Sequence, residues 1–280
     1  MEISKAWQKN YIDILSIWVD DDELVDELVK TFPLLSKKCP TCPSEFDQDY
    51  GTWRSQGFYT YEGKRFACDC VYQNRLHFLY SLSGIGADYQ RLDWSDVKIE
   101  DTDILNPIID YLTNYDAYLR EGVGLFLHGT AGTGKTLLAN LIAKEFVKLG
   151  KSVRVFNFSN LLDSYTAGWK DNNLKLRHEH MIKNADLLVI DDIGKELSDK
   201  LGAAQLDAAL RTRYSNSRPT IITSNLSKGK IEANYKSEFI TSLISGSMID
   251  IMFTGGRDFR PRDLEARLAR INNNSIRPIV

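Results

Sequence analysis

The stretch Gly129-Thr-Ala-Gly-Thr-Gly-Lys135-Thr136 decides the fold class of this chain. It matches the pattern G-x-x-x-x-G-K-[S/T], in which glycines let backbone amides turn toward the oxygens of a phosphate group. The apolar residues 125–127 before it predict a buried strand, and residues 136–144 after it predict a helix. This strand–loop–helix setting indicates a nucleotide-binding loop rather than a glycine-rich turn that binds nothing.

The two residues that end the stretch have separate expected roles. We expect the amine of Lys135 to reach the β- and γ-phosphates of ATP, and the hydroxyl of Thr136 to bind Mg²⁺. The N-terminus of the following helix adds a field that favours phosphate. The residues expected to contact the nucleotide are Gly129, Thr130, Ala131, Gly132, Thr133, Gly134, Lys135, Thr136 and Leu137.

Two acids follow an apolar run further along the chain. The segment Asp186-Leu-Leu-Val-Ile-Asp191-Asp192 predicts a buried parallel strand, and the carboxyl ends of such strands form the ligand-binding edge of open α/β sheets. We expect Asp191 to bind the Mg²⁺ ion and Asp192 to act as general base toward the attacking water. A strand end that merely meets solvent has the same pattern, so the assignment depends on the loop upstream.

Composition and charge limit the classes of protein to which this chain can belong. The chain has 280 residues, enough for one large domain or two, with 43% hydrophobic and 26% charged residues. Its formal net charge of −3 creates no overall field for nucleic acid, so contact with nucleic acid requires a local patch. The sequence shows neither a signal peptide nor an apolar run long enough to span a membrane. We therefore expect a cytoplasmic protein without a membrane partner.

All four cysteines lie in two short pairs, Cys39-Pro-Thr-Cys42 and Cys68-Asp-Cys70. Two thiolate pairs on turns are able to close a tetrahedral Zn²⁺ site, and a cytosolic setting disfavours disulfides. The sequence thus predicts zinc at Cys39, Cys42, Cys68 and Cys70, with His77 as a possible substitute ligand. Four reduced, buried cysteines are the alternative.

The order of the expected elements predicts an α/β fold. Buried strands are expected at 153–158, 187–190 and 220–223, with helices between them and a further strand at 248–253. Strands that alternate with helices predict a mostly parallel sheet with helices on both faces. A helix over 105–119 leads into the strand before the nucleotide loop.

The N-terminal part has a different pattern. Residues 1–38 are predicted to be helical, 43–67 to form short hairpins around a metal, and 76–82 to form a helix that ends at residues 83–86. We therefore expect an N-terminal helical and zinc-binding domain, 1–90, that contacts a protein partner. The nucleotide-binding domain is expected to cover 91–280.

The motifs together resemble those of the AAA+ ATPases, and more narrowly the replicative helicase loaders of the DnaC and DnaI type. The resemblance covers most of the chain from about Cys39 onward. It is carried by Ser83–Arg91, Gly129–Thr136, Leu187-Leu-Val-Ile-Asp-Asp-Ile-Gly194 with Glu196, Pro219-Thr-Ile-Ile-Thr-Ser-Asn225, Gly246-Ser247 and Gly255-Gly-Arg-Asp-Phe-Arg260.

The resemblance implies an AAA+ phosphate-loop fold and ATP hydrolysis with Mg²⁺. It places Asn225 at sensor 1, where a side-chain amide orients the lytic water, and Arg260 at a sensor-2-like position that contacts the nucleotide. A turn-capping role for Asn225 and a solvent-facing Arg260 are the alternatives.

One position departs from the family pattern. The loaders usually have Ser-Arg-Leu before the Gly-Ser pair, and that arginine reaches into a neighbouring subunit's ATP site. Here Ser242 stands at this position, with Arg213 and Arg257 as candidate replacements. Such a finger contributes about 10³–10⁵ in rate, so its absence predicts weak hydrolysis or a finger from elsewhere.

A contact with single-stranded DNA is also expected from the resemblance. Residues 165–177 mix Tyr165 and Trp169 with Lys170, Lys175 and Arg177. Aromatic faces stack on bases and cations bind phosphates in single-strand binders. A helix with one packed aromatic face and one solvated basic face explains the same residues.

The resemblance favours a loader that binds a hexameric helicase of the DnaB type through its N-terminal domain and delivers it to single-stranded DNA. Self-association is expected when the chain is assembled on the helicase. Two alternatives remain: a transposition helper of the IstB type, and a slowly hydrolysing regulator that occupies a helicase. The acidic run at 20–23 favours a protein partner over duplex DNA. A metabolic kinase is disfavoured, because the Asp-Asp-Ile-Gly and Thr-Ser-Asn motifs indicate water activation.

Overall fold

The computed structural model describes residues 34–35, 43–48, 52–55, 58–67, 76, 79–160, 179–194, 200–235, 238–254, 265 and 268. The chain divides into two compact units. One comprises Met1–Leu82, Gly86–Arg91 and Arg277–Val280, and the other Ser83–Ile85 and Leu92–Ile276. No helix among the described residues is long and apolar enough to cross a membrane.

The larger unit is built on a five-stranded sheet of order β10-β6-β9-β8-β7, in which every neighbouring pair is parallel. Because the strands are parallel, all of their carboxyl ends lie along one edge. The prediction of a mostly parallel sheet is confirmed, and so is its last strand. The strands are β6 (Gly124–Gly129), β7 (Val153–Asn157), β8 (Leu187–Ile193), β9 (Thr220–Ser224) and β10 (Met248–Phe253).

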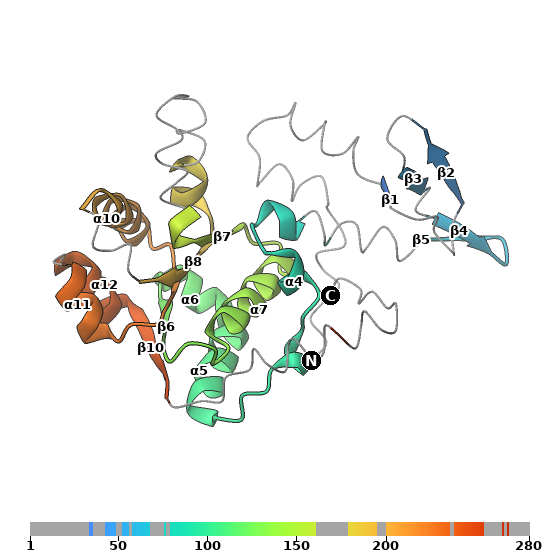
Figure 1. Ribbon diagram of the computed structural model, residues 1–280. Coiled ribbons are helices and arrows are strands. Elements are labelled where there is room, and N and C mark those ends of the chain that lie inside the picture. The colour runs from blue at the N-terminus through green and yellow to red at the C-terminus, as the bar shows by residue number, and fades with distance from the viewer. Residues whose placement is uncertain are drawn as a thin grey trace. The chain divides into compact units, whose positions relative to one another are not determined.

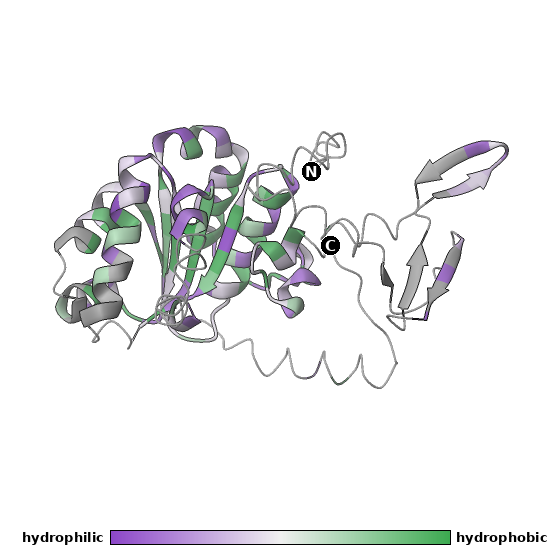
Figure 2. Ribbon diagram, turned by 90° about the horizontal axis from the view of Figure 1, so that it is seen from above, coloured by the Kyte–Doolittle hydropathy of each residue, from purple (hydrophilic) through white to green (hydrophobic). Residues whose placement is uncertain are grey.

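Helices cover both faces of this sheet, and Figure 2 shows the apolar strands between two helical layers. Helices α5 (Thr102–Thr113) and α7 (Lys135–Lys148) pack on the strands from one side. The other layer contains α10 (Lys200–Ser215), α11 (Lys228–Tyr235) and α12 (Glu238–Ser247), as Figure 1 labels them.

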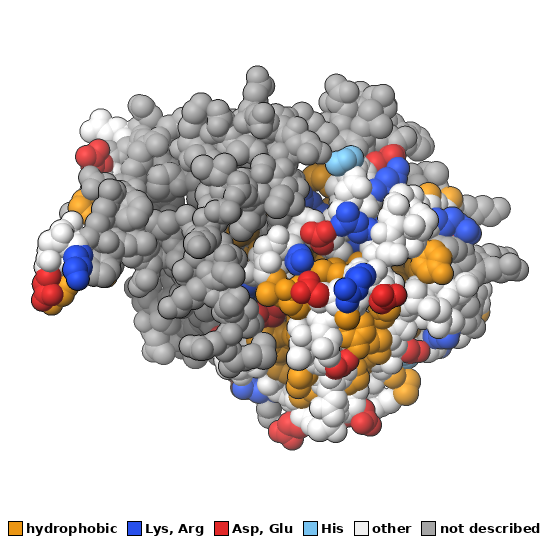
Figure 3. Space-filling model, turned by 180° about the vertical axis from the view of Figure 1, so that it is seen from behind, with side chains coloured by type: hydrophobic (Ala, Val, Ile, Leu, Met, Phe, Trp, Pro, Cys, Tyr) orange, Lys and Arg blue, Asp and Glu red, His pale blue; other side chains and the backbone are white. Residues whose placement is uncertain are grey.

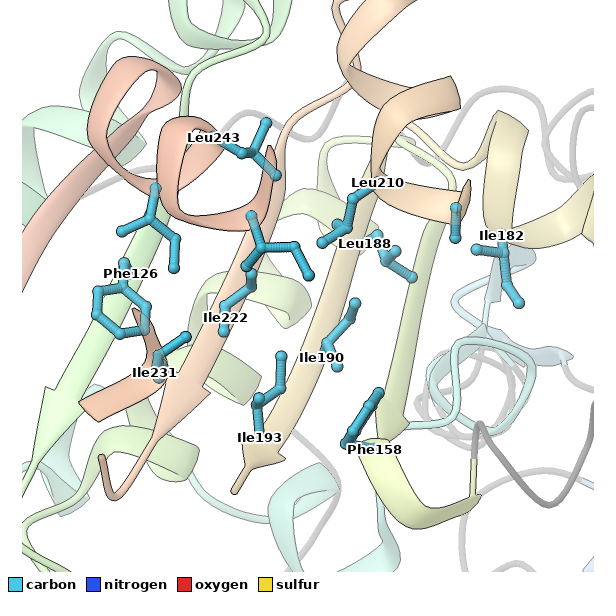
Figure 4. Close-up of a cluster of buried hydrophobic side chains, with 13 residues drawn as sticks. Phe126, Phe158, Ile182, Leu188, Ile190, Ile193, Leu210, Ile222, Ile231 and Leu243 are labelled. Atoms are coloured by element: carbon cyan, nitrogen blue, oxygen red, sulfur yellow. The ribbon is translucent and has the colours of Figure 1, made fainter. Parts of the chain in front are cut away.

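The core beneath α10, α11 and α12 follows from the alternation of side chains along the strands. Phe126, Leu188, Ile190 and Ile222 point from three strands toward these helices and are almost completely buried. In Figure 4, Leu210 and Leu243 reach down from the helices to meet them. Packing of this kind holds the strands, and therefore their carboxyl ends, in fixed positions.

The single helix predicted over 105–119 was wrong, because the structure has two helices there, α5 and α6 (Tyr115–Glu121). They meet at Asn114, whose backbone leaves the helical region at φ −106° and ψ 27°. The Asn114 side-chain amide donates a hydrogen bond of 2.7 Å to Asp110 Oδ1. Such a local bond offers the chain an alternative to continuing the helix.

Strand β7 lies at the edge of the sheet, and Ser83 and Gly84 cover it. The Val155 amide donates to the Ser83 carbonyl oxygen at 2.7 Å. A Cβ atom on Gly84 would lie 2.4 Å from the Val155 carbonyl oxygen, and Gly84 has a φ of +77°. Only glycine fits this approach, which explains why the helix predicted over 76–82 ends there.

The smaller unit contains the predicted hairpins. Strands β1 (Leu34–Leu35), β3 (Thr52–Ser55) and β2 (Ser44–Asp47) form an antiparallel sheet, and β4 (Phe58–Tyr61) pairs with β5 (Lys64–Ala67). The helix predicted through residue 38 is wrong at Leu34–Leu35, which follow Pro33, a residue that interrupts helices. The four predicted zinc ligands, Cys39, Cys42, Cys68 and Cys70, and their substitute His77 lie outside the described residues.

Candidate functional site

The predicted nucleotide loop connects the end of β6 to the start of α7. Gly132 and Gly134 have φ values of +80° and +94°, which residues with side chains rarely adopt. A Cβ atom on Gly129 would lie 2.2 Å from the Phe253 carbonyl oxygen, so the loop begins against the end of β10. The Thr133 hydroxyl donates to the Thr130 carbonyl oxygen at 2.7 Å and holds the turn closed. The loop therefore has the tight backbone that the sequence predicts.

The side chain of Lys135 lies inside this loop. Its amine donates to the carbonyl oxygens of Gly129 at 3.0 Å and Thr130 at 2.6 Å, and approaches the Thr133 hydroxyl at 3.4 Å. The residue is 6% exposed. The loop therefore concentrates a buried positive charge beside backbone amides, and this combination attracts a phosphate group.

Thr136 and Asp191 meet at the carboxyl edge of the sheet. The Thr136 hydroxyl donates to Asp191 Oδ1 at 2.9 Å, although α7 and β8 supply the two residues separately. Hydroxyl and carboxylate oxygens are the ligands that Mg²⁺ prefers, and Mg²⁺ in phosphate sites takes few protein ligands. The pair thus fits the magnesium role that the sequence predicts for it.

Burial affects the charge of Asp191. Desolvation raises the pKa of its carboxyl group, while hydrogen bonds from the hydroxyls of Thr223 and Thr136 act in the opposite direction. A raised pKa means that the charged form is disfavoured in the folded protein. A divalent cation at this carboxylate would offset that cost.

Asp192 and Asn225 form a second pair at the same edge. The Asn225 amide donates to Asp192 Oδ1 at 2.8 Å, and both side chains are exposed. Asp192 has a φ of +58°, an uncommon conformation for a residue other than glycine. Strained residues of this kind gather at functional sites. β8 and β9 are neighbours in the sheet, so the two side chains meet at its carboxyl edge.

Thr223 is the site residue that the sequence analysis did not single out. It is 1% exposed, accepts a hydrogen bond of 2.9 Å from the Asp192 amide, and donates one of 2.6 Å to Asp191 Oδ1. A buried hydroxyl residue two positions before Asn225, near the carboxyl end of β9, is the signal that would have revealed it.

The arginine candidates have different outcomes. The prediction that Arg213 is an arginine finger is wrong, because its guanidinium is completely buried. It donates to the carbonyl oxygens of Ile182, Ala185 and Pro219 at 2.6–2.8 Å and to the Thr220 hydroxyl at 3.1 Å. These contacts lie at the amino ends of the strands, on the opposite edge from the nucleotide loop. Ser242 is exposed on α12, and Arg257 and Arg260 lie outside the described residues.

The predicted DNA-contacting residues, Tyr165 through Arg177, also lie outside the described residues. On the face of the molecule drawn in Figure 3, positive and negative side chains are interspersed. Described cations of the larger unit include Lys151, Lys183 and Arg218, which pair with Asp116, Glu179 and Asp186 at 3.6, 3.3 and 2.5 Å. These three pairs are locally neutral and give no basic stripe.

Comparison with known families and structures shows which proteins this chain is similar to. The pattern of the family described as IstB-like ATP binding protein matches residues 96–252, more than half of the chain. The crystal structure of a DnaC helicase loader superposes with a TM-score of 0.53 at 24% identity, covering 60% of this chain and 100% of that one. This likeness shows the α/β AAA+ fold.

Two curated relatives are replicative helicase loaders. DnaI of Bacillus subtilis (strain 168) is 26% identical over 152 residues, which are 54% of this chain and 48% of DnaI. DnaC of Buchnera aphidicola subsp. Schizaphis graminum is 26% identical over 192 residues, covering 65% of this chain and 74% of DnaC. The match with DnaI therefore spans about half of that relative's length.

Proposed function

Because this chain belongs to the family of IstB-like ATP binding proteins, we propose that it binds ATP with Mg²⁺ at the carboxyl edge of its sheet and hydrolyses it. One observation carries the proposal. Lys135, Thr136, Asp191, Asp192 and Asn225 come from α7, β8 and the end of β9, and the hydrogen bonds described above join the last four in pairs.

The roles of these residues follow from their chemistry. Lys135 and the loop amides would bind the phosphates, and Thr136 and Asp191 would hold a Mg²⁺ ion, which would supply positive charge to the transferred phosphoryl group. Asp192 accepts the proton of a water that attacks the γ-phosphorus, and the bond from that phosphorus to the ADP oxygen breaks. Asn225 orients this water and fixes the Asp192 carboxylate.

We further propose that the chain acts as a helicase loader. Two relatives bear this name, and the acidic residues 20–23 fit a protein partner better than duplex DNA. The partner would be a hexameric helicase of the DnaB type, delivered to single-stranded DNA. Bound ATP would act as a switch by ordering loops through its γ-phosphate.

A slowly hydrolysing helicase regulator is the second candidate, and Ser242 favours it. The exposed serine on α12 cannot supply the positive charge that an arginine finger brings to a neighbouring site. ATP turnover that stays near zero with helicase and DNA present would identify such a regulator.

We propose that the N-terminal domain predicted at 1–90, which overlaps most of the smaller unit, binds the partner, and that 91–280 forms the nucleotide-binding domain. Zinc at Cys39, Cys42, Cys68 and Cys70 would stabilise it, since small metal sites contribute directly to folding. Their sequence spacing supports this part of the proposal.

Steady-state ATP turnover tests the function. The rate is measured for the chain alone, with single-stranded DNA, with its host's replicative helicase, and with both. We expect Mg²⁺-dependent turnover that rises when helicase and DNA are both present. An absence of turnover in all four conditions would contradict the proposed hydrolysis of ATP.

A further inference from the structure

The pairing of β8 with β9 contains an irregularity at the functional site. Ile190 pairs with Ile222, and Ile193 pairs with Ser224. Between these pairs, Asp191 and Asp192 on β8 stand opposite the single residue Thr223 on β9. This arrangement is a β-bulge, which inserts one extra residue and redirects the side chains around it.

The bulge changes where the two acids point. In a regular strand, successive side chains alternate between the two faces of the sheet. With the extra residue, Asp191 reaches the Thr136 hydroxyl at the start of α7, and Asp192 reaches the Asn225 amide after β9. Both carboxylates therefore serve the same edge of the sheet.

A bulge leaves backbone groups without their usual hydrogen-bond partners in the strand ladder. Here the Thr223 hydroxyl serves as the partner of one such group. It accepts the Asp192 amide at 2.9 Å and donates to Asp191 Oδ1 at 2.6 Å. One side chain thus fixes the backbone of one acid and the carboxylate of the other. Its burial, with 1% exposure, keeps water from replacing it.

We propose that Thr223 is a positioning residue of the nucleotide site, whose hydroxyl locks the β8 bulge so that Asp191 faces the metal position and Asp192 faces the attacking water. This inference rests on the proposed ATP-binding function. The hydroxyl is needed as donor and acceptor at once, and among residues of this shape only threonine provides both. Valine keeps the shape without the hydroxyl, and serine keeps the hydroxyl without the methyl group.

The test is a Mg²⁺ titration of the full chain with a fluorescent ATP analogue, combined with steady-state kinetics. For Thr223→Val we expect the Mg²⁺ concentration at half-maximal binding to rise about 10–100-fold, because residues that orient metal ligands contribute about this much. The kcat should fall by a similar factor, whereas KM for ATP at saturating Mg²⁺ should change less than about threefold. Thr223→Ser should restore both values to within about threefold of the parent chain.

Thr220→Val is the matched control. Thr220 lies on the same strand, is 4% exposed, and accepts a hydrogen bond of 3.1 Å from Arg213, but at the opposite edge of the sheet. The Thr220→Val variant therefore loses a buried hydroxyl that contacts neither Asp191 nor Asp192. A Mg²⁺ midpoint that moves as far in Thr220→Val as in Thr223→Val would overturn the proposal, and so would a Thr223→Val midpoint equal to the parent's.

A second variant is used if Thr223→Val does not fold. If Thr223→Val lacks a cooperative melt, Thr223→Cys replaces it, because its thiol is a weak donor and acceptor. An unshifted midpoint in the cysteine variant then counts against the proposal, and a raised one supports it.

If the parent chain itself shows no Mg²⁺-dependent ATP binding, the proposed function fails and Thr223 loses its role with it. A parent that binds while Thr223→Val matches it leaves the function standing and removes only this inference.

Discussion

At the scale of single residues, the candidate site depends on a few side chains whose geometry matches their chemistry. Lys135 is held by loop carbonyl oxygens, so its charge is already desolvated and placed beside the amides of the nucleotide loop. Desolvated charges interact with a ligand more strongly than charges in water do. Loss of this amine should therefore weaken ATP binding strongly.

The first prediction concerns Lys135→Ala. We expect ATP affinity, measured by isothermal titration calorimetry, to fall at least about 30-fold, as when a buried charge partner is removed. Lys148→Ala is the control on the same helix, because Lys148 lies at its far end and contacts Glu145 at 3.4 Å. Equal affinity in the parent chain and Lys135→Ala would remove the phosphate-binding assignment.

The second prediction concerns Asp192→Asn. The variant keeps the side-chain shape but cannot accept a proton, so turnover should fall about 10²–10⁴-fold while ATP still binds. Turnover is followed by phosphate release, and binding by calorimetry on the same preparation. Unchanged turnover would exclude Asp192 as the general base.

The types and spacing of the candidate site residues can be read from the sequence, but the hydrogen bonds between them cannot. The glycines, Lys135, Thr136 and Asp191 are recognisable because their types and spacing are required for phosphate binding. The bulge was not predictable, because it depends on pairing between strands that lie far apart in the chain. Arg213 was misassigned for the same reason, since a sequence does not reveal which arginine becomes buried.

At the scale of elements, Arg213 connects α10 to the segments that precede β8 and β9. Its guanidinium contacts the carbonyl oxygens of Ile182 and Ala185 before β8 and of Pro219 before β9. Burial lowers its pKa, and four hydrogen bonds offset the cost of the desolvated charge. Its role is therefore structural.

The third prediction follows from these contacts. Arg213→Met should lower the free energy of unfolding, measured in urea, by roughly 2–4 kcal/mol, because several buried carbonyl oxygens lose their donor. Arg211→Met, on the exposed side of the same helix and paired with Asp207, should change it by less than about 0.5 kcal/mol. An unfolding free energy of Arg213→Met equal to that of the parent chain would contradict this structural role.

The strands and their direction were predictable from apolar runs that alternate with helices. The break between α5 and α6 was not, because the apolar periodicity continues across it while the Asn114 bond to Asp110 decides the geometry. Local hydrogen bonds of this kind compete with helix formation and leave little trace in periodicity.

At the scale of the whole molecule, the proposed function combines an ATP site in the larger unit with partner binding by the smaller unit. The cysteine spacing gives the fourth prediction, that the purified chain contains one zinc ion. Elemental analysis measures it, and Cys42→Ser together with Cys70→Ser should lose the metal and lower the melting temperature. Zinc-free protein that is folded and has four titratable thiols would contradict the prediction.

Recognition of a protein partner depends on surface residues that no sequence motif describes. The proposed helicase partner is supported by the names of relatives and by the acidic run at 20–23. A direct measurement of helicase binding therefore tests the proposed partnership.

That measurement is native mass spectrometry of the full chain mixed with its host's replicative helicase, with and without ATP, alongside Lys135→Ala. The account predicts a helicase hexamer that carries several copies of the parent chain, with occupancy that depends on ATP in the parent and not in the variant. Absence of any complex, with ATP or without it, would contradict the account and favour a transposition helper or another DNA-remodelling role.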